Sequence, residues 1–252
     1  MSIERIPQQR IDEAVALLKH IKREFAPAAF ANSLGAEDMV LTDLIARHTP
    51  GIEVFTLDTG RLHEETYRLM QKVADQYDLR LRVYFPQPEA VQQYAGAHGV
   101  NGFYESIELR KACCHARKVE PLGRALKGKA AWITGLRREQ AVTRRDLPER
   151  EFDAALGIEK FNPLAAWSEA EVWAYIQAYG VPYNELHERG FPSIGCAPCT
   201  RALKGWRSRP EEVLLGCALA ADEDLRAGRW WWEDPATKEC GLHPAKRSIV
   251  AA

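Results

Sequence analysis

The chain has 252 residues, 46% of them hydrophobic, and its 34 lysines and arginines nearly balance 35 aspartates and glutamates. This length is enough for one large domain with a buried core. The near-zero net charge excludes a protein that coats nucleic acid or a membrane surface through a general basic charge. Any anionic ligand must therefore be held by local basic residues.

Neither a membrane span nor an export signal is expected. No stretch approaches about 18 uninterrupted apolar residues, and the first segment, 1–20, carries charges where a signal peptide needs an apolar run. We therefore predict a cytoplasmic protein. In that reducing compartment the six cysteines are read as metal ligands, redox groups or buried thiols rather than as structural disulfides.

Helices and strands alternate along most of the chain. Apolar residues at helical spacing predict helices over residues 11–25, 37–48, 63–77, 88–98, 108–126 and 168–180. Short apolar runs predict strands over residues 28–34, 52–57, 79–85 and 130–135. Residues 135–151 read as a basic loop and residues 181–202 as a turn-rich segment. We expect an α/β fold, with a twisted parallel sheet that helices cover on both faces.

Three of the predicted strands end in residues suited to a nucleotide, because ligands of open parallel sheets bind at the carboxyl ends of the strands. In "NSLGAED", Ser33 and Gly35 offer backbone N–H groups at a helix N-terminus. In "LDTGR", Leu57 could pack on a base while Asp58 and Thr59 offer hydrogen bonds. The plainer interpretation, a tight turn and a helix cap, stays open at both.

The third strand end, "TGLRREQAVTRR", is rich in arginine. Guanidinium groups suit phosphate and sulfate oxygens, so the segment could form a flexible cationic lid. A solvated basic loop is the alternative. The arginines in question are Arg137, Arg138, Arg144 and Arg145.

The cysteines carry a sharper signal. Cys113 and Cys114 are adjacent, and Cys196 and Cys199 form a CxxC pair in a Gly/Pro turn. Four such thiolates can bind tetrahedral zinc or an iron–sulfur cluster. Adjacent helical side chains point about 100° apart, which favours a [4Fe–4S] cluster with a different iron for each thiolate. Zinc and four unrelated buried thiols remain the alternatives. Lys118, one helical turn after Cys114, could offset the cluster's charge and reach an anionic substrate.

These residues resemble a known family, the assimilatory adenylyl-sulfate (APS) reductases, which are the iron–sulfur branch of the phosphoadenylyl-sulfate (PAPS) reductase family. The blocks that carry the resemblance run in family order over most of the chain: "SLGAED", "LDTGRLHEETY", "CCHARKVEPL", "TGLRREQ", "KFNPLAAWSEAEVWAYI", "VPYNELHERGFPSIGCAPCTR" and "GRWWWEDPATKECGLH". The resemblance implies an adenine-nucleotide α-hydrolase-like fold, a [4Fe–4S] cluster on the four paired cysteines, and thioredoxin-dependent reduction of APS to sulfite and AMP.

The resemblance also assigns roles near the C-terminus. Cys240 matches the family's nucleophile, whose S-sulfocysteine intermediate thioredoxin or glutaredoxin would resolve. Arg226 and Arg229 match positions that hold sulfate or phosphate oxygens, and His243 could aid thiolate formation or bind an oxyanion. The predicted substrate-binding residues are Ser33, Gly35, Asp38, Leu57, Asp58, Thr59, Gly60, Gly135, Arg137, Arg138 and Arg144.

The predicted organisation is a nucleotide- and cluster-binding domain over residues 1–205, followed by a linker and a mobile tail over residues 206–252. The stretch before the tail looks longer than is usual in the family and contains Cys217, which reads as a buried thiol with a resolving role as the alternative. A homo-oligomer is possible.

Two other activities compete with APS reduction. PAPS or dual APS/PAPS reduction differs by a 3′-phosphate, and PAPS-specific members generally lack the paired cysteines. A thiolating ATP pyrophosphatase acting on RNA is less favoured, because "NSLGAEDM" lacks the second glycine and the terminal serine of an SGGxDS loop. The neutral net charge also disfavours an RNA substrate.

Overall fold

A six-stranded sheet in the order β3-β2-β1-β4-β6-β5 forms the centre of the computed structural model, which describes residues 6–141, 144–203, 225–234, 238 and 242. The strands are β1 (Ala28–Ala31), β2 (Glu53–Leu57), β3 (Leu81–Tyr84), β4 (Ala131–Ile133), β5 (Arg150–Asp153) and β6 (Ile158–Phe161). All neighbouring strands pair in parallel except β5 and β6. The predicted α/β fold with its parallel sheet is confirmed, with one antiparallel edge strand added.

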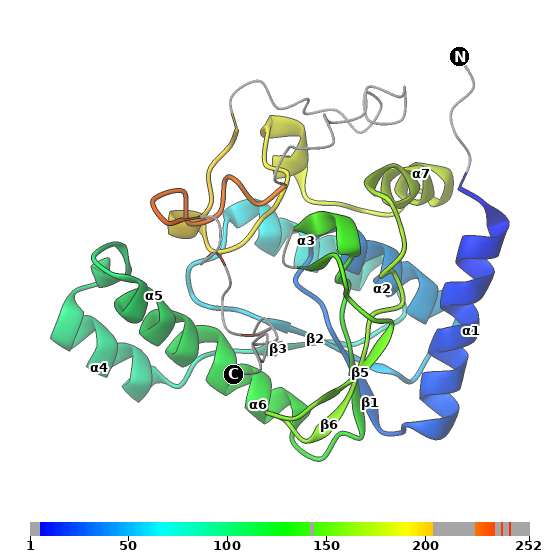
Figure 1. The fold of residues 1–252 in the computed structure, drawn as a ribbon, viewed down its shortest axis with the longest axis horizontal. Helices are drawn as coiled ribbons and strands as arrows, with labels where there is room; N and C mark the ends of the chain where they lie inside the picture. Colours follow the sequence, from blue (N-terminus) through cyan, green and yellow to red (C-terminus); the bar gives the residue numbers. More distant parts are fainter. Residues whose placement is uncertain (1–5, 142–143, 204–224, 235–237, 239–241, 243–252) are drawn as a thin grey trace, which may run out of the picture.

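Helices cover both faces of this sheet (Figure 1). The helices are α1 (Gln8–Glu24), α2 (Ala36–His48), α3 (Glu64–Gln76), α4 (Pro88–His98), α5 (Ile107–Cys114), α6 (Glu120–Leu126) and α7 (Glu169–Tyr179). Buried residues of α1, α2, α3 and α7 share one core cluster, and those of α6 belong to a cluster on the other face.

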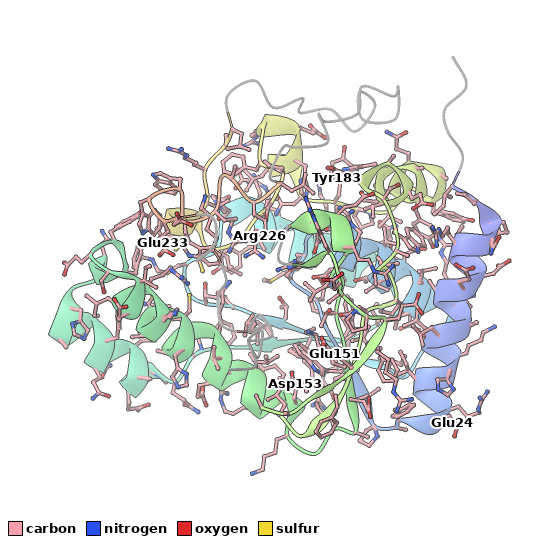
Figure 2. The ribbon with its side chains drawn as sticks, in the orientation of Figure 1. Glu24, Glu151, Asp153, Tyr183, Arg226 and Glu233 are labelled. Carbon is pink, nitrogen blue, oxygen red and sulfur yellow. The ribbon has the colours of Figure 1, made fainter. Side chains whose placement is uncertain are left out.

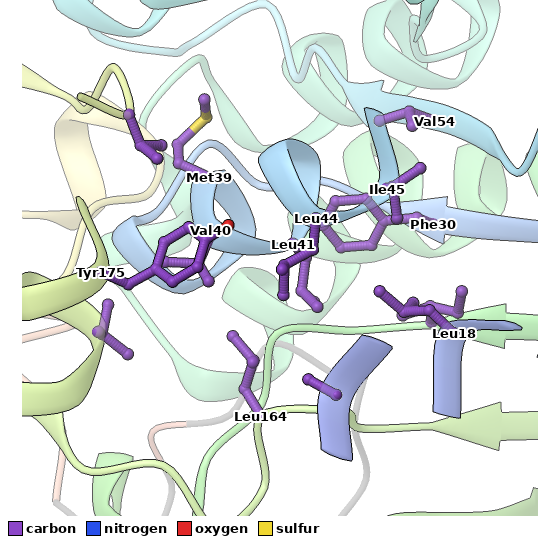
Figure 3. Packing of buried hydrophobic residues seen from close by; sticks show 14 of the residues in the cluster. Leu18, Phe30, Met39, Val40, Leu41, Leu44, Ile45, Val54, Leu164 and Tyr175 are labelled. Atoms are coloured by element: carbon purple, nitrogen blue, oxygen red, sulfur yellow. The ribbon is translucent and has the colours of Figure 1, made fainter. Parts of the chain in front are cut away.

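The strands alternate between these two clusters, as the period of two in a β-strand requires. Phe30 of β1 and Ile133 of β4 pack with α1 and α2, whereas their neighbours Ala29 and Trp132 face α6. Figure 3 shows the larger cluster, in which Leu18 and Leu44 pack beside Phe30. A sheet buried on both faces explains why the central strands read as continuous apolar runs.

Two expectations about local structure need correction. The predicted basic loop ends in β5, and β6 was not expected, because both strands contain charged residues. Lys160 of β6 is buried, pairs with Glu151 at 3.0 Å and lies over the ring of Trp132. The single helix expected over 108–126 is interrupted by one wide π-helical turn, His115–Val119. Such turns often occur at functional sites.

The described part of the C-terminal region packs back on the domain. Thr200 pairs with Arg229 as an isolated bridge, and the amide of Trp230 donates to the carbonyl of Cys199 at 3.1 Å. Segment 225–234 therefore lies beside the CxxC turn (Figure 1). The predicted boundary between residues 205 and 206, and Cys217, lie outside the described residues. Within the described residues, no helix is long and apolar enough to cross a bilayer.

Candidate functional site

A pocket of about 220 Å³ opens at the carboxyl ends of β1, β2 and β4. This is the edge of an open parallel sheet where ligands bind. The substrate-binding and catalytic residues predicted from sequence that line it are Ser33, Gly35, Asp38, Leu57, Lys118, Gly135, Arg144, Arg226 and Arg229. Segments from both ends of the chain thus meet at one site.

Asp38 ties two of the pocket's loops together. Its carboxylate accepts hydrogen bonds from the backbone N–H and the hydroxyl of Ser33, both at 2.6 Å, and from the backbone of Gly135. A Cβ at Gly135 would meet Asp38 Oδ1 at 2.1 Å, so only glycine fits there. Burial raises the pKa of Asp38 to about 6, although the bonds from Ser33 lower it. Asp38 thereby fixes the loop geometry.

One wall of the pocket is apolar. Leu57, Leu122 and Trp132 line it, and Leu242 from the C-terminal region packs against the same core cluster. Flat and branched apolar side chains of this kind suit the faces of a heterocyclic base. The expected position of Leu57 at the pocket is therefore found, together with two partners that the sequence did not indicate.

Three cationic side chains also line the pocket, those of Lys118, Arg226 and Arg229. The guanidinium carbons of Arg229 and Arg226 lie 4.6 and 5.6 Å from the ring centroid of Trp230. Arg226 also donates to the carbonyl of Lys238 at 2.7 Å. Figure 2 shows Arg226 on the same side of the molecule as Glu233, from the same short segment. Three cationic side chains that line one pocket suit an anionic ligand.

The arginines of the expected lid separate in the structure. Arg144 lines the pocket and donates to Gln140 at 2.6 Å. Arg137 is 1% exposed and pairs with Glu37 at 2.8 Å, so it is a buried structural cation rather than part of a flexible lid. Arg138 donates to the carbonyl of Leu147. Arg137 and Arg138 are not among the described residues that line the pocket.

The loop after β2 points toward the cysteines instead. Asp58 accepts hydrogen bonds from the N–H of Gly60 and from Tyr67, and the hydroxyl of Thr59 lies 3.2 Å from the sulfur of Cys196. Of this loop, the described pocket lining includes Leu57 and Leu62 but not residues 58–60. Asp58, Thr59 and Gly60 thus lie between the pocket and the second cysteine pair.

The four paired cysteines line a second, small cavity of about 20 Å³ beside the pocket. Cys113 and Cys114 come from the end of α5, and Cys196 and Cys199 come from the turn beside segment 225–234. Lys118 lines both cavities. Among the described residues, no three His, Cys, Asp or Glu side chains are placed to hold one metal ion. The expected convergence of the cysteines is found, and their cofactor stays a prediction.

Positive charge surrounds these sulfurs. Arg61, Arg110, Arg117 and Lys118 line the cysteine cavity. Burial acts to raise the pKa of Cys196, but Lys118, the Thr59 hydroxyl, Arg229 and Arg117 together outweigh it and hold that pKa below its usual value. Burial raises the pKa of Cys199 to about 12. The setting favours a group whose net charge is negative.

Cys240 and His243 lie outside the described residues. The described residues around them, Lys238 and Leu242, belong to the site. Lys238 is buried and its carbonyl accepts from Arg226, while Leu242 lines the pocket. Of the two described residues that flank the predicted nucleophile in sequence, Leu242 thus lines the pocket and Lys238 contacts Arg226, which lines it.

Sequence reasoning missed Glu37, His187 and Trp230. Glu37 and His187 line the pocket, and Trp230 supports its arginines. Glu37 directly precedes Asp38 in "NSLGAED", so the sequence could have indicated it as a pocket residue. His187 lies in the turn-rich segment 181–202, where nothing local marks it as a pocket residue. Trp230 is the first of three adjacent tryptophans in "GRWWWEDPATKECGLH", and the sequence does not show which of them packs on the arginines.

Comparison with known proteins identifies the family. Residues 27–202 match the family model described as phosphoadenosine phosphosulfate reductase domain. The chain is 55% identical to an adenosine 5′-phosphosulfate reductase from Allochromatium vinosum, over 91% of this chain and 84% of the relative. It is 52% identical to one from Burkholderia cepacia, over 93% of this chain and 87% of the relative.

Solved structures agree on the fold. The phosphoadenylyl-sulfate (PAPS) reductase from Candida auris, solved as a phosphate complex, is 32% identical with a TM-score of 0.66, covering 79% of this chain and 100% of the other. The FMN adenylyltransferase of Candida glabrata is 16% identical with a TM-score of 0.56, over 79% of this chain and 66% of the other. At that identity the likeness concerns the fold alone.

Proposed function

The chain belongs to the family described as phosphoadenosine phosphosulfate reductase domain, and we propose that it reduces adenosine 5′-phosphosulfate (APS) to sulfite and AMP in sulfate assimilation. The observation that carries the proposal is Lys118, which lines the pocket and the four-cysteine cavity at once. Apolar side chains suited to a base, cations suited to phosphate and sulfate, and a thiol-rich cavity are thereby joined in one site. The names of the relatives select APS as the substrate.

We propose Cys240 as the nucleophile. Its thiolate attacks the sulfur of the sulfate group, an S–S bond forms, the S–O bond to the phosphate breaks, and AMP leaves with the electron pair. Arg226, Arg229 and Lys118 stabilise the negative charge on the transferred and leaving oxygens. Support comes from Lys238 and Leu242, which flank the cysteine in sequence and belong to the site. His243 is proposed to aid thiolate formation or bind an oxyanion.

Release of sulfite then needs a second thiol. An external dithiol protein, thioredoxin or glutaredoxin, attacks the sulfur of Cys240, sulfite leaves, and the mixed disulfide is resolved by the second thiol of the partner. The two electrons of the reduction come from that dithiol, which becomes a disulfide. We place this exchange in the cytoplasm, where the dithiol is kept reduced. The tail over 206–252 is proposed as the unit that presents Cys240.

The four cysteines are proposed to hold a [4Fe–4S] cluster. Their convergence on one cavity from two separate segments fits such a group, and so does the surrounding positive charge. When bound, the cluster would supply a fixed anionic centre that orders Lys118 and the CxxC turn beside the sulfate. Zinc is the alternative cofactor. The colour of the anaerobically purified protein distinguishes the two, because a [4Fe–4S] cluster makes it brown and zinc leaves it colourless.

PAPS is the second candidate substrate, because the chain is 32% identical to a PAPS reductase over that protein's full length and Arg144 adds a further cation to the pocket. The test supplies APS or PAPS with reduced thioredoxin under anaerobic conditions and measures sulfite and nucleotide product. We expect sulfite and AMP from APS and little product from PAPS. Sulfite from PAPS alone would contradict the proposed substrate, and sulfite from neither would contradict the proposed function.

A further inference from the structure

The guanidinium group of Arg229 occupies the space where a side chain at position 195 would lie. Gly195 and Arg229 both line the pocket. A Cβ atom on Gly195 would come closer than 3.0 Å to Cζ and to both terminal nitrogens of Arg229, whereas ordinary contacts between carbon atoms are about 3.5–4.0 Å. Any residue other than glycine at this position therefore displaces the guanidinium group.

The backbone itself does not require glycine at this position. Gly195 is not among the described glycines with a positive φ, so alanine can adopt the same conformation. The three heavy atoms nearest to the added Cβ would all belong to the end of the Arg229 side chain. Alanine therefore fits the fold, and what it changes is the position of one guanidinium group.

Hydrogen bonds hold the two backbones together at this point. The N–H of Gly195 donates to the hydroxyl of Thr200 at 3.2 Å, and Thr200 pairs with Arg229 as an isolated bridge. The amide of the next residue, Trp230, donates to the carbonyl of Cys199 at 3.1 Å. Because the two segments are fastened in this way, the side chain of Arg229, rather than the backbone, takes up the displacement.

The present position of the guanidinium group is also set by its other contacts. Nη1 of Arg229 donates to the carbonyl of Ile194 at 3.3 Å, and Cζ lies 4.6 Å from the ring centroid of Trp230. Arg229 is only 8% exposed, so the space around it leaves few alternative positions. A shift of about 1 Å would lengthen or misalign the hydrogen bonds that the guanidinium group makes to a bound anion.

We propose that Gly195 is a positioning residue, which by lacking a side chain lets Arg229 hold the anionic end of the ligand. Gly195 directly precedes Cys196 in the chain. The turn that carries the CxxC pair thus also sets the affinity of the pocket for an anion. The inference rests on the proposed function for the role of Arg229 toward the phosphate or sulfate group.

Binding of APS to the full-length protein, purified anaerobically with its cysteine site intact, tests this by calorimetry. All proteins carry Cys240→Ser and no reductant is added, so that binding is measured without turnover. We expect Gly195→Ala to bind APS about tenfold more weakly than this Cys240→Ser parent, because a displaced guanidinium group loses charge-assisted hydrogen bonds.

Adenosine is the second ligand, because it lacks both anionic groups. It should bind to Gly195→Ala and to the parent with the same affinity. An equal loss on APS and on adenosine would overturn the inference, since the substitution would then have disturbed the pocket as a whole.

The decisive comparison adds a variant at Arg229. In Arg229→Ala the group that Gly195→Ala displaces is absent, so the second substitution should cause no further loss of APS affinity. Additive losses in the double variant would contradict the inference. Gly123→Ala is the matched control, because a Cβ there would have no described heavy atom within 4 Å and Gly123 is not among the described residues lining the pocket. It should bind APS as the parent does.

The metal content and the melting temperature of Gly195→Ala should equal those of the parent. A loss of metal would place the role of the glycine in the cysteine site and would sink the inference. Unchanged APS affinity in Gly195→Ala would do the same and leave the proposed function standing. Failure of the parent to bind APS would contradict the proposed function itself, so the two failures can be told apart.

Discussion

The hydroxyl of Thr59 lies 3.2 Å from the sulfur of Cys196, and this contact joins the loop after β2 to the second cysteine pair. Thr59 also accepts from the N–H of Arg61 at 3.2 Å, so the hydroxyl organises its own loop as well. The strand that supplies Leu57 to the pocket thus leads directly into the cysteine cavity. The same short loop therefore contributes to both cavities.

Replacement of Thr59 by valine keeps the side chain's shape and removes the hydroxyl. A hydrogen bond to a charged group contributes about 1.5–3 kcal/mol. If the four cysteines hold the proposed cluster, we expect Thr59→Val to lose its iron to a chelator about tenfold faster than wild type. Visible absorbance under anaerobic conditions follows the loss. Thr59→Ser restores the hydroxyl and should restore the slow rate. Equal rates in all three proteins would show that the contact does not hold the cofactor.

Trp230 supports the cations at the pocket. Its ring is 1% exposed and lies under Arg229 and Arg226, with Arg110 at 4.7 Å from its centroid. Each cation–π contact contributes about 0.5–2 kcal/mol. We expect Trp230→Leu to raise the KM for APS about tenfold or more, because the two arginines proposed to bind the sulfate lose their platform. Trp230→Phe keeps an aromatic face and should recover part of the loss.

Trp231 is the control for that experiment, since its ring contacts Tyr104, Trp232 and Arg201 rather than the pocket's arginines. Trp231→Leu should leave the KM near the wild-type value. Should Trp230→Leu remain folded with an unchanged KM, the arginines are held by other contacts and the prediction fails.

Glu169 predicts a pH dependence of stability. Burial raises its pKa from about 4.5 to about 7, despite the opposing effect of Arg137. Between these values the folded chain binds more protons than the unfolded chain, so this residue's contribution to stability falls as pH rises. We expect Glu169→Gln to increase the free energy of unfolding by about 2 kcal/mol at pH 8 and to change it little at pH 4.

Denaturant titrations at the two pH values measure this difference. Glu89 provides the control, because it too lies in the first turn of a helix, α4, but is exposed. Glu89→Gln should have a small effect at both pH values. A Glu169→Gln variant that is equally destabilised at pH 4 and pH 8 would mean that the carboxylate acts through its hydrogen bonds and not through its charge.

The sequence predicted the parts of the fold that depend on local apolar patterns. β1, β2 and β4 were found because both of their faces are buried, which makes their sequences continuously apolar. β6 was missed because Lys160 stands in it, and only the partner Glu151 and the ring of Trp132 make that burial tolerable. Such compensation comes from residues distant in sequence and is not visible in a local pattern.

The site residues likewise divide into those that a local sequence pattern predicts and those that it does not. Ser33 and Leu57 were predictable, because strand ends of a parallel sheet converge. The sequence predicts Arg137 in a basic lid, because its local pattern shows only neighbouring arginines. The partner that pairs with it, Glu37, stands 100 positions earlier in the chain. His187 was missed because nothing in its segment shows that a turn brings it to the pocket with Nε2 unpaired. The positions of these side chains are set by contacts between residues distant in sequence, which the residue types alone do not reveal.

The most direct test of the whole account is the intact mass of the protein after incubation with APS and no reductant. We predict that wild type gains the mass of one sulfo group on Cys240, that reduced thioredoxin removes it as sulfite, and that Cys240→Ser gains nothing. An adduct that persists in Cys240→Ser, or turnover of APS to sulfite by that variant, would contradict the assignment of Cys240 as the attacking group.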